Sequence, residues 1–439
     1  MTWRKVKLGE VLARVRNLVE IEDDKEYKLV TVRLHHKGVT LRRLARGNEL
    51  NSTKMHSVKA GDFILSGIDA RHGAFGIIPN ELDGAVVTND FWCLGLDKNV
   101  IDRDLFLKLT STSYFDDLCK KASDGTTNRV RLQADRFYNL EIDLPSIEKQ
   151  KKLIEEFQKL ETTNSQIAYE LSHQLDLVSQ LRQAFLREAM QGKLVPQDVR
   201  DEPAEILLEK IKAEKAKLIA EKKIKKEKPI AEIKAEEIPF AIPNSWLWCR
   251  LGSIVESMNN GLYKPEEFYN TSGIACLRMY NIQAGQISFH KLKRMVLTDA
   301  EVETYSLRKG DLLLNRVNSV ELLGKAAYID EPRETLVYES KNIRARLIEK
   351  SITPKFVNCI FLTNIIREQI LRNFKKVTGQ ASINQEQLSS FVIPLPPLAE
   401  QKRIVEKLEK LMAYCDELEA NIRTSKGHET LLQVALEPR

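Results

Sequence analysis

The sequence of 439 residues lacks any long apolar run. No stretch approaches the ~20 consecutive apolar residues that a helix needs to cross a bilayer. The first residues, MTWRKVKLGE, also lack the apolar core of a signal peptide. With 43% hydrophobic and 30% charged residues, the composition is that of a folded protein, and we expect a cytoplasmic protein with no membrane partner.

Cysteine and histidine pairs with metal-ligand spacing are lacking too. The six cysteines form no C-x-x-C motif and are not closely spaced with the seven histidines. His35 and His36 are adjacent, so on a strand they would face opposite sides. We therefore expect no metal site and no disulfide framework, but reduced thiols in the protein core.

Signatures of common catalytic sites are also absent. There is no G-x-x-x-x-G-K-[ST] phosphate loop, no G-x-G-x-x-G nucleotide motif and no Asn-Pro-Pro or Asp-Pro-Pro motif of amino-methyltransferases. Asp62 and Asp311 lie in repeated Gly-Asp turns, where a turn or capping role is favoured over metal binding. We predict no catalytic residue, although an enzyme with an unfamiliar site stays open as a third interpretation.

One stretch of the chain occurs twice. LPSIEKQKKLIEEFQKL spans residues 144–160 and LPPLAEQKRIVEKLEKL spans 395–411, at a constant offset of 251. The similarity extends upstream, where WRKVKLGEVLARV begins at Trp3 and WLWCRLGSIVESM begins at Trp246. Such self-similarity predicts a tandem duplication, in which each half is a β-rich globular region followed by a long helix.

Apolar residues recur at alternating steps of four and three in both copies, which is typical of a coiled-coil seam. A helix of about 40 residues would be roughly 60 Å long and would act as a spacer. Polar seam positions such as Asn164 and Gln174 would fix the register of an antiparallel pair. The alternative, that each helix packs on its own domain, stays open. The predicted apolar seam consists of Leu153, Phe157, Leu160, Ile167, Leu171, Leu181 and Phe185, and of Ile404, Leu408, Leu411, Leu418, Ile422, Leu432 and Leu436.

The predicted fold class is α/β (α+β), with two globular domains separated by two long antiparallel coiled-coil helices in an internal pseudo-twofold repeat. In each globular half, short apolar runs alternate with Gly, Asn and Asp, which indicates strands joined by turns. The predicted segments are globular regions 1–142 and 243–393, helical regions 143–200 and 394–439, and a Lys/Glu-rich helix with a linker at 201–242.

The net charge of +6 lies in the globular halves. Residues 1–142 carry 23 Lys and Arg against 20 Asp and Glu, and residues 243–393 carry 20 against 15. A duplicated basic domain on a neutral spacer would suit a protein that meets two places on one polyanion, but a random imbalance explains the numbers almost as well. For the Lys/Glu run at 205–228, a solvated helix with a flexible linker is favoured over a DNA-binding tail or docking helix.

Three segments carry a resemblance to a known family: AFLREAMQGKLVPQDVRDEPAEILL at 184–208, IPNSWLWCRLGSI at 242–254 and IPLPPLAEQKRIVEKL at 393–408. With the duplication, they make the chain similar to the specificity subunit of type I restriction-modification systems. The resemblance implies two target recognition domains, each reading one half of a bipartite double-stranded DNA target, with the paired helices fixing the gap. It also implies that the chain itself binds no cofactor. S-adenosylmethionine, ATP and Mg would bind to partner subunits, namely two methyltransferase subunits and restriction/translocase subunits.

By the same resemblance, polar residues in the loops of the two domains are candidates for DNA binding. Arginine can pair with guanine, Asn and Gln with adenine, and lysine more often holds phosphate. Arg33 and Arg278 lie at equivalent positions in both halves, which indicates shared structure or backbone contact. The candidates are Lys37, Arg71, His72, Arg129 and Arg131 in the first domain, and Tyr280, Asn281, Arg316, Asn318, Lys375, Lys376 and Gln380 in the second.

The alternative function is a coiled-coil scaffold whose duplicated domains bind protein partners. Binding by such a scaffold would depend little on salt, whereas DNA attachment through several phosphates weakens steeply as salt rises.

Overall fold

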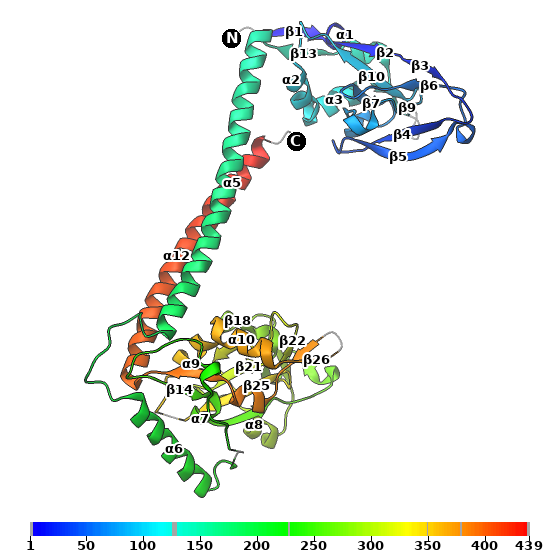
Figure 1. Ribbon diagram of the computed structural model, residues 1–439. Helices are drawn as coiled ribbons and strands as arrows, with labels where there is room; N and C mark the ends of the chain where they lie inside the picture. The colour runs from blue at the N-terminus through cyan, green and yellow to red at the C-terminus, as the bar shows by residue number, and fades with distance from the viewer. Residues whose placement is uncertain (1–2, 125–129, 227–228, 349, 378–379, 437–439) are drawn as a thin grey trace. The chain divides into compact units, whose positions relative to one another are not determined.

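The structure is a computed structural model that describes residues 3–124, 130–226, 229–348, 350–377 and 380–436. The chain divides into unit 1, Met1–Ser172 with Arg423–Arg439, and unit 2, His173–Ile422. Each unit holds one globular region and part of two long helices, α5 (Ile147–Met190) and α12 (Leu398–Leu436) (Figure 1). The predicted combination of two α/β regions with two long helices is confirmed.

Strands and short helices alternate along the globular region of unit 1, where η marks a 3₁₀ helix. They are β1 (Arg4–Lys7), α1 (Leu8–Val11), β2 (Leu12–Val15), β3 (Leu18–Glu20), β4 (Glu26–Val32), β5 (Val39–Arg46), η1 (Gly47–Glu49), β6 (Lys54–Ser57), β7 (Phe63–Ser66), η2 (Ala70–His72), β8 (Phe75–Ile77), η3 (Asn80–Leu82), β9 (Val86–Val87), β10 (Phe91–Leu96), α2 (Arg103–Thr110), α3 (Ser113–Lys121), β11 (Ser123–Asp124), β12 (Arg131–Leu132), α4 (Ala134–Tyr138) and β13 (Glu141–Leu144).

Two sheets form the body of unit 1. One has the strand order β2-β10-β7-β8 and the other β3-β6-β9-β4-β5, while β1 pairs with β13. Strand β13 shows the sequence logic, since Ile142 and Leu144 are buried and the alternating Glu141 and Asp143 are exposed. Phenylalanines from β7, α2, α3 and α4 meet edge to face in the core below the first sheet.

Unit 2 follows the same plan after a connecting segment that contains α6 (Ala204–Ala220) and η4 (Ala235–Glu237). Its globular region consists of β14 (Leu247–Arg250), α7 (Leu251–Ile254), β15 (Val255–Asn260), η5 (Glu266–Phe268), β16 (Tyr269–Asn270), β17 (Ile274–Leu277), η6 (Met279–Asn281), β18 (Ile282–Gln283), β19 (Gln286–Ile287), β20 (Lys293–Met295), α8 (Asp299–Tyr305), β21 (Leu312–Asn315), β22 (Val317–Asn318), β23 (Ala326–Tyr328), β24 (Leu336–Tyr338), β25 (Asn342–Leu347), α9 (Pro354–Phe361), α10 (Asn364–Asn373), β26 (Lys375–Val377), β27 (Gln380–Ser382), α11 (Gln385–Ser389) and β28 (Val392–Leu395).

The first sheet and the first-to-last strand pair of unit 2 repeat those of unit 1, whereas the second sheets, β16-β20-β17-β24 and β3-β6-β9-β4-β5, differ in strand order. The sheet β15-β25-β21-β23 corresponds to β2-β10-β7-β8, and the pair β14-β28 corresponds to β1-β13. The parallel pair β17/β24 corresponds to the parallel pair β4/β9. Helices α2, α3 and α4 begin 251 residues before α9, α10 and α11, which is the offset found in the sequence. The predicted tandem duplication is therefore confirmed.

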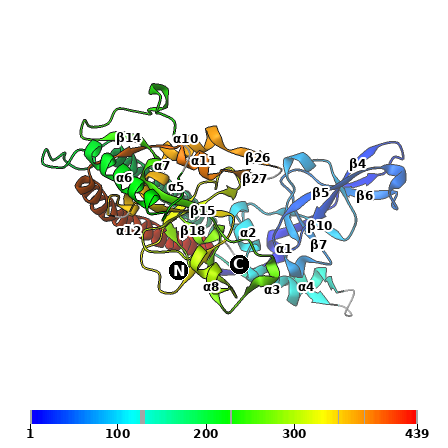
Figure 2. The same ribbon diagram turned by 90° about the horizontal axis from the view of Figure 1, so that it is seen from below.

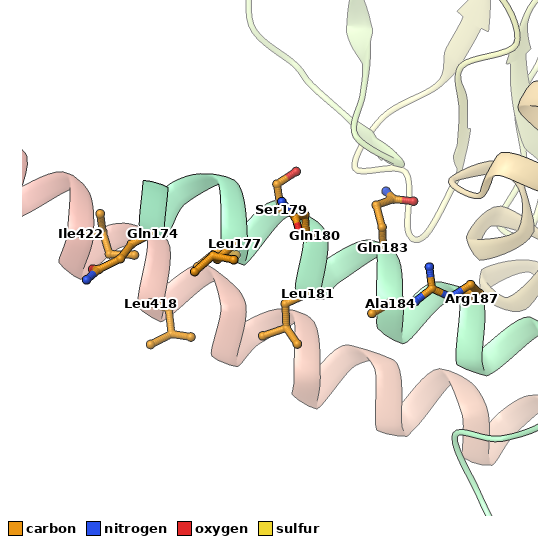
Figure 3. A pocket seen from close by; sticks show the side chains of 11 residues that line it. Gln174, Leu177, Ser179, Gln180, Leu181, Gln183, Ala184, Arg187, Leu418 and Ile422 are labelled. Carbon is orange, nitrogen blue, oxygen red and sulfur yellow. The ribbon is translucent and has the colours of Figure 1, made fainter. Parts of the chain in front are cut away.

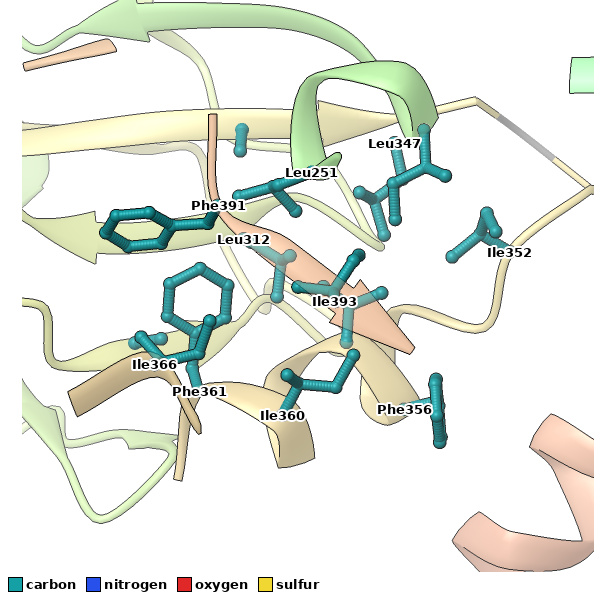
Figure 4. Packing of buried hydrophobic residues seen from close by; sticks show 14 of the residues in the cluster. Leu251, Leu312, Leu347, Ile352, Phe356, Ile360, Phe361, Ile366, Phe391 and Ile393 are labelled. Carbon is teal, nitrogen blue, oxygen red and sulfur yellow. The ribbon is translucent and has the colours of Figure 1, made fainter. Parts of the chain in front are cut away.

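The core of unit 2 joins the sheet to the helices. Phe356 and Ile360 of α9 pack against Phe391 and Ile393 at β28, and Leu312 of β21 completes the contact (Figure 4). All five side chains are at most 1% exposed. The same cluster includes residues from the end of α5 and the start of α12, so these helix ends are anchored to the globular region.

A repeated glutamine fixes the start of each long helix. Gln150 Oε1 accepts a hydrogen bond from Asp102 N at the start of α2 (2.7 Å), and Gln401 Oε1 accepts one from Thr353 N at the start of α9 (2.9 Å). Each Nε2 donates to the carbonyl of the proline five residues earlier, at 2.9 Å and 3.0 Å. Both glutamines are fully buried, which gives a structural reason for their presence in both copies of the repeated stretch.

Helices α5 and α12 run antiparallel. In unit 1, Asn164 Nδ2 donates to Glu429 Oε1 (3.0 Å), and Lys426 Nζ donates to Ser172 Oγ (3.1 Å), so positions rise along one helix as they fall along the other. The polar seam position Asn164 thus contacts the other helix as predicted. In unit 2 the two helices also lie side by side (Figure 1).

The predicted seam is buried to different extents along its length. Ile404 and Leu408 are at most 2% exposed, whereas Leu160 and Ile167 are 53% and 44% exposed. Leu160 lies one helix turn before Asn164, which contacts Glu429, and the side chains of α12 after Thr430 lie outside the described residues. The side chains of two other predicted members, Leu432 and Leu436, lie outside the described residues. The remaining members are partly buried: Leu153, Phe157, Leu171, Leu181, Phe185, Leu411, Leu418 and Ile422.

The start of α12 also packs on its own globular region. Ile404 and Leu408 belong to the core cluster of unit 2, and Lys355 of α9 forms an ion pair with Glu409 (2.7 Å). Both interpretations of the apolar stripe therefore hold for α12, which contacts α5 and its own domain.

The Lys/Glu-rich helix α6 has one buried face. Ala204, Leu207 and Ile211 are at most 4% exposed, and Lys215 Nζ donates to Gly252 O at α7 (2.9 Å). The favoured interpretation of this segment as a solvated helix is therefore wrong, because every third or fourth position is apolar and packs on unit 2.

All six cysteines are free thiols, and five of them are buried. Burial raises the pKa of Cys93 to about 11 and that of Cys276 to about 12, so these thiols stay protonated and unreactive at neutral pH. Within the described part of the chain, no helix is both long and apolar enough to cross a membrane.

Candidate nucleic-acid interface

Three of the predicted DNA-binding residues lie together in unit 1. Lys37 is exposed in the turn between β4 and β5, while the partly buried Arg71 and the exposed His72 belong to η2. His35 N donates to His72 O (2.8 Å), which joins the two turns, and Arg71 Nε donates to His72 Nε2 (2.9 Å). Figure 2 shows β4, β5 and β6 close together in this unit. The structure thus brings Lys37, Arg71 and His72 onto one surface.

The β4–β5 turn is held in an unusual backbone conformation. His35 and His36 both have φ of 57°, the left-handed region that residues other than glycine rarely adopt. His36 Nε2 lies 3.0 Å from Asp116 Oδ1 of α3, and its ring packs on Phe75. A Cβ on Gly73 would lie 2.6 Å from His36, so only glycine permits this close approach. Such strain is found preferentially at binding sites.

Of the other two candidates of unit 1, the structure describes Arg131, which belongs to β12. Arg131 forms an ion pair with Asp90 (3.0 Å), and Leu132 N donates to Gly67 O (2.8 Å), so β12 lies beside the chain segment that leads into η2. Arg129 lies outside the described residues.

In unit 2, Tyr280 and Asn281 belong to η6 but differ in exposure. Tyr280 is 37% exposed, and its hydroxyl donates to Lys291 O (3.2 Å). Asn281 is fully buried, and its Nδ2 donates to Ser288 O (2.8 Å) and His290 O (3.2 Å). The structure therefore favours a role for Asn281 in shaping the loop over base contact.

Arg278, not included among the candidates, organises this surface. Its Nε donates to Glu339 Oε2 (2.9 Å), and its guanidinium lies 5.0 Å and 5.3 Å from the ring centres of Tyr269 and Tyr280. Burial raises the pKa of Tyr269 to about 12. The equivalent Arg33 in unit 1 is exposed and has no such cage, so the expected common role of the two arginines is only partly met. The Tyr-x₈-Arg-x-Tyr spacing carries no recognisable signal for this cage.

Arg316 and Asn318 follow β21. Arg316 Nη1 donates to Ser340 O (3.3 Å), while its buried Nε has no hydrogen-bond partner among the described residues. Asn318 Nδ2 donates to the buried Asn315 Oδ1 (2.9 Å). Arg316 is thus the less fully engaged of the two side chains.

The remaining candidates share a small sheet with Asn318. In the order β22-β27-β26, both Asn318 and Lys376 pair with Ala381. Lys375 belongs to the outer strand β26 and Gln380 to the central strand β27, but the side chains of Lys375, Lys376 and Gln380 lie outside the described residues. The backbone nevertheless brings four predicted residues from segments about 60 positions apart into one sheet.

The described residues contain no cluster of acidic, histidine or cysteine side chains that could hold a metal ion. A groove along the long helices of unit 2 is lined by Leu177, Leu181, Leu418 and Ile422, with glutamines and Arg187 at its sides (Figure 3). Such a lining offers apolar contact and hydrogen bonds but no carboxylate, histidine or cysteine for acid–base or nucleophilic chemistry.

Comparison with known proteins gives this fold a family. The family model described as "Type I restriction modification DNA specificity domain" matches residues 1–176 and 243–425, so both repeats match. The type I restriction enzyme EcoEI specificity subunit of Escherichia coli is 30% identical over 292 residues, which are 62% of this chain and 49% of that protein. The EcoAI specificity subunit of Escherichia coli is 35% identical over 269 residues, 59% of this chain and 44% of that protein. The chain spans about half the length of these curated relatives.

Solved structures share the fold at lower identity. A chain from the structure described as "Structural basis underlying complex assembly and conformational transition of the type I R-M system" aligns with a TM-score of 0.59 at 16% identity, covering 99% of this chain and 96% of that chain. The HsdS subunit from Thermoanaerobacter tengcongensis aligns with a TM-score of 0.56 at 16% identity, covering 99% and 95%. Since the family model covers most of the sequence and both of its repeats, the chain belongs to the type I restriction modification DNA specificity family.

Proposed function

We propose that this chain is the DNA-recognition subunit of a type I restriction-modification complex. The globular regions 1–142 and 243–393 each read one half of a bipartite double-stranded target, and the paired helices fix the gap. The observation that carries the proposal is the duplication, with the same strand order in the first sheet of both repeats and a match of each repeat to the specificity-domain family. Two equivalent antiparallel helices are related by a twofold axis, which is also the local symmetry of duplex DNA.

Residues at the described surfaces would contact the DNA. In the first half, Lys37, Arg71 and His72 form one group and Arg131 belongs to the strand β12, while Arg129 lies outside the described residues. In the second half, Tyr280 belongs to η6 and Arg316 follows β21, and Lys375, Lys376 and Gln380 share a sheet with Asn318. Arginine supplies two donors to guanine, whereas lysine mainly holds phosphate, so the arginines are the stronger candidates for base recognition.

Chemistry would reside in partner subunits. The chain carries no catalytic residue in this proposal and acts in the cytoplasm. Two methyltransferase subunits would bind S-adenosylmethionine and dock on the helices, and restriction/translocase subunits would use ATP and Mg. The antiparallel helix pair offers equivalent surfaces to two copies of the same partner.

The test is to co-express the chain with the methyltransferase subunit of its system and to map methylated adenines in the host genome. We expect a new split motif with a fixed gap, absent when either chain is omitted. The double substitution Lys37→Ala/Arg71→Ala should relax or weaken only the half read by residues 1–142. No new methylation by a complex that forms with a competent methyltransferase would contradict the proposal and favour the protein-binding scaffold.

A further inference from the structure

The β4–β5 hairpin of unit 1, residues 26–46, concentrates positive charge. It carries six Lys and Arg against one Glu, a formal net charge of +5. Residues 1–142 carry 23 Lys and Arg against 20 Asp and Glu, so the rest of this half has 17 against 19 and is slightly acidic. The small excess of positive charge in residues 1–142 therefore comes from one strongly basic element, the hairpin.

A β-bulge exposes the basic side chains of this hairpin. Leu29 pairs with Arg43 and Val30 pairs with Leu41, so Arg42 is the extra residue on β5. A regular strand would turn alternate side chains inward, but Leu41, Arg42, Arg43 and Leu44 are all exposed. Strand β5 is also the edge of its sheet, with a hydrogen-bonded neighbour on one side only.

Most of these cations have no acidic partner. No described carboxylate lies within ion-pair distance of Lys37, Arg42 or Arg46, while Arg43 pairs with Glu49 (2.8 Å) where both side chains are about half exposed. In unit 2 the strand β20, next to β17, carries Arg294, which is held by two bonds to Glu334 (2.7 and 2.8 Å). The hairpin of unit 1 thus presents charge that the fold itself leaves unneutralised.

The charged residues of β5 could also serve the fold alone, by protecting the edge of the sheet. Charged residues on an exposed edge strand prevent aggregation, and here they flank Leu41 and Leu44, which are 49% and 48% exposed. That role needs charge of either sign, whereas the hairpin after Glu26 carries cations alone. It also gives no reason for the bulge at Arg42, which lies between the exposed Leu41 and Arg43. Charge of one sign on the edge hairpin of this five-stranded sheet instead suits a polyanion.

We propose that the β4–β5 hairpin binds the DNA duplex of the first half-site, with Arg42 and Arg46 of the edge strand on phosphates and the β4–β5 turn, beside Arg71 of η2, towards the bases. This proposal rests on the proposed function and adds the element of the chain that binds the phosphate backbone of the DNA. A two-stranded ribbon fits the major groove of B-DNA. The strained turn at His35 and His36 then fixes where the tip sits relative to η2.

The experiment uses the full chain in complex with its methyltransferase subunit. The DNA is an unmethylated duplex that carries the motif found by the methylation mapping. Binding of wild type and of Arg42→Gln/Arg46→Gln is measured between 50 and 200 mM salt, together with hydroxyl-radical footprints. Losing two phosphate contacts should make the slope of log affinity against log salt less steep by about 1.8. Between 50 and 200 mM salt, the DNA affinity of the wild type should therefore fall by a factor about tenfold larger than that of the variant. The footprint should weaken over the first half-site only.

The control is Lys407→Gln/Lys410→Gln, which removes two exposed cations from α12 of unit 2 and should leave the slope unchanged. An unchanged slope and footprint for the hairpin variant would overturn the inference and leave the edge-protection role. Loss of complex formation with the methyltransferase subunit would overturn it too, in favour of an acidic protein surface as the partner. If the wild-type complex selects no sequence, the proposed function fails before the variants are compared.

Discussion

Equivalent positions in the two repeats differ at the end of the first strand of each, β1 and β14. Lys7 in unit 1 is exposed, and its Nζ reaches only Asn139 Oδ1 (3.2 Å). Arg250, its counterpart in unit 2, is 8% exposed and donates to Ser390 O (2.7 Å) and to both oxygens of Glu237 (2.7 and 2.8 Å). The guanidinium holds the pKa of Glu237 at about 2.

The same contrast continues at the start of the long helices. Trp246 is 5% exposed and its Nε1 donates to Glu400 Oε2 (2.9 Å), whereas the equivalent Trp3 is 53% exposed. Arg403 pairs with Asp201 (2.6 Å) in the segment that follows α5. That segment, residues 191–242, connects the repeats and wraps on unit 2 alone.

The comparison shows that duplicated sequence does not give the same burial and hydrogen bonding at equivalent positions. The two repeats share the strand order of the first sheet and the helix positions, but the connecting segment packs on unit 2, so polar groups exposed in one repeat are buried and hydrogen-bonded in the other. Unit 2 should therefore unfold at higher denaturant than unit 1. Because two units with different stabilities need not unfold together, each must be followed separately.

The largest expected difference in the loss of unfolding free energy is between Arg250→Ala in unit 2 and Lys7→Ala in unit 1. The first leaves Glu237 and three backbone carbonyls without their donor, which should cost unit 2 about 3–5 kcal/mol. The second removes an exposed side chain and should cost unit 1 less than about 1 kcal/mol. Hydrogen exchange of peptides from each unit measures both. Arg250→Lys keeps the positive charge but loses the planar guanidinium with its several N–H donors. The stability of unit 2 in this variant should lie between those of wild type and Arg250→Ala.

A smaller difference is expected along the helix seam. Leu408→Ala creates a cavity in the core of unit 2 and should lower its free energy of unfolding by about 2–5 kcal/mol. Leu160→Ala, at a seam position 53% exposed, should cost less than about 1 kcal/mol. Urea unfolding followed by exchange in each unit gives the two values. Equal losses would show that Leu160 is covered in solution by a partner or by a second copy of the chain.

Much of the fold was predictable because its signals are periodic. The offset of 251 predicted the duplication, and the heptad steps predicted two long helices. The exposure of Leu160 and Ile167 was not predictable, since a seam pattern does not tell how closely the facing helix packs at each position. The buried face of α6 was missed because its Lys and Glu content outweighed Leu207 and Ile211.

The candidate site was only partly predictable for a similar reason. Loop composition selected Lys37, Arg71 and His72, and the fold does place them together. The same reasoning selected Asn281, which is buried, because composition does not distinguish an amide that binds a base from one that holds a loop. The bulge that exposes Arg42 depends on strand register, which the hydrophobic pattern of a single strand does not determine.

The smallest predicted difference in the free energy of unfolding is between substitutions of the repeated glutamine in the two units. Gln150→Leu and Gln401→Leu each leave a buried N–H at the start of the neighbouring helix and a proline carbonyl without a partner. Each should cost its own unit about 1–3 kcal/mol, because both glutamines make this pair of bonds, and Gln150 Nε2 also donates to Val100 O (2.9 Å). Hydrogen exchange of α2 and α9 peptides measures the two losses side by side. A large loss in one unit with none in the other would mean that the shared hydrogen bonds, unlike the shared strand order, have diverged in energy since the duplication.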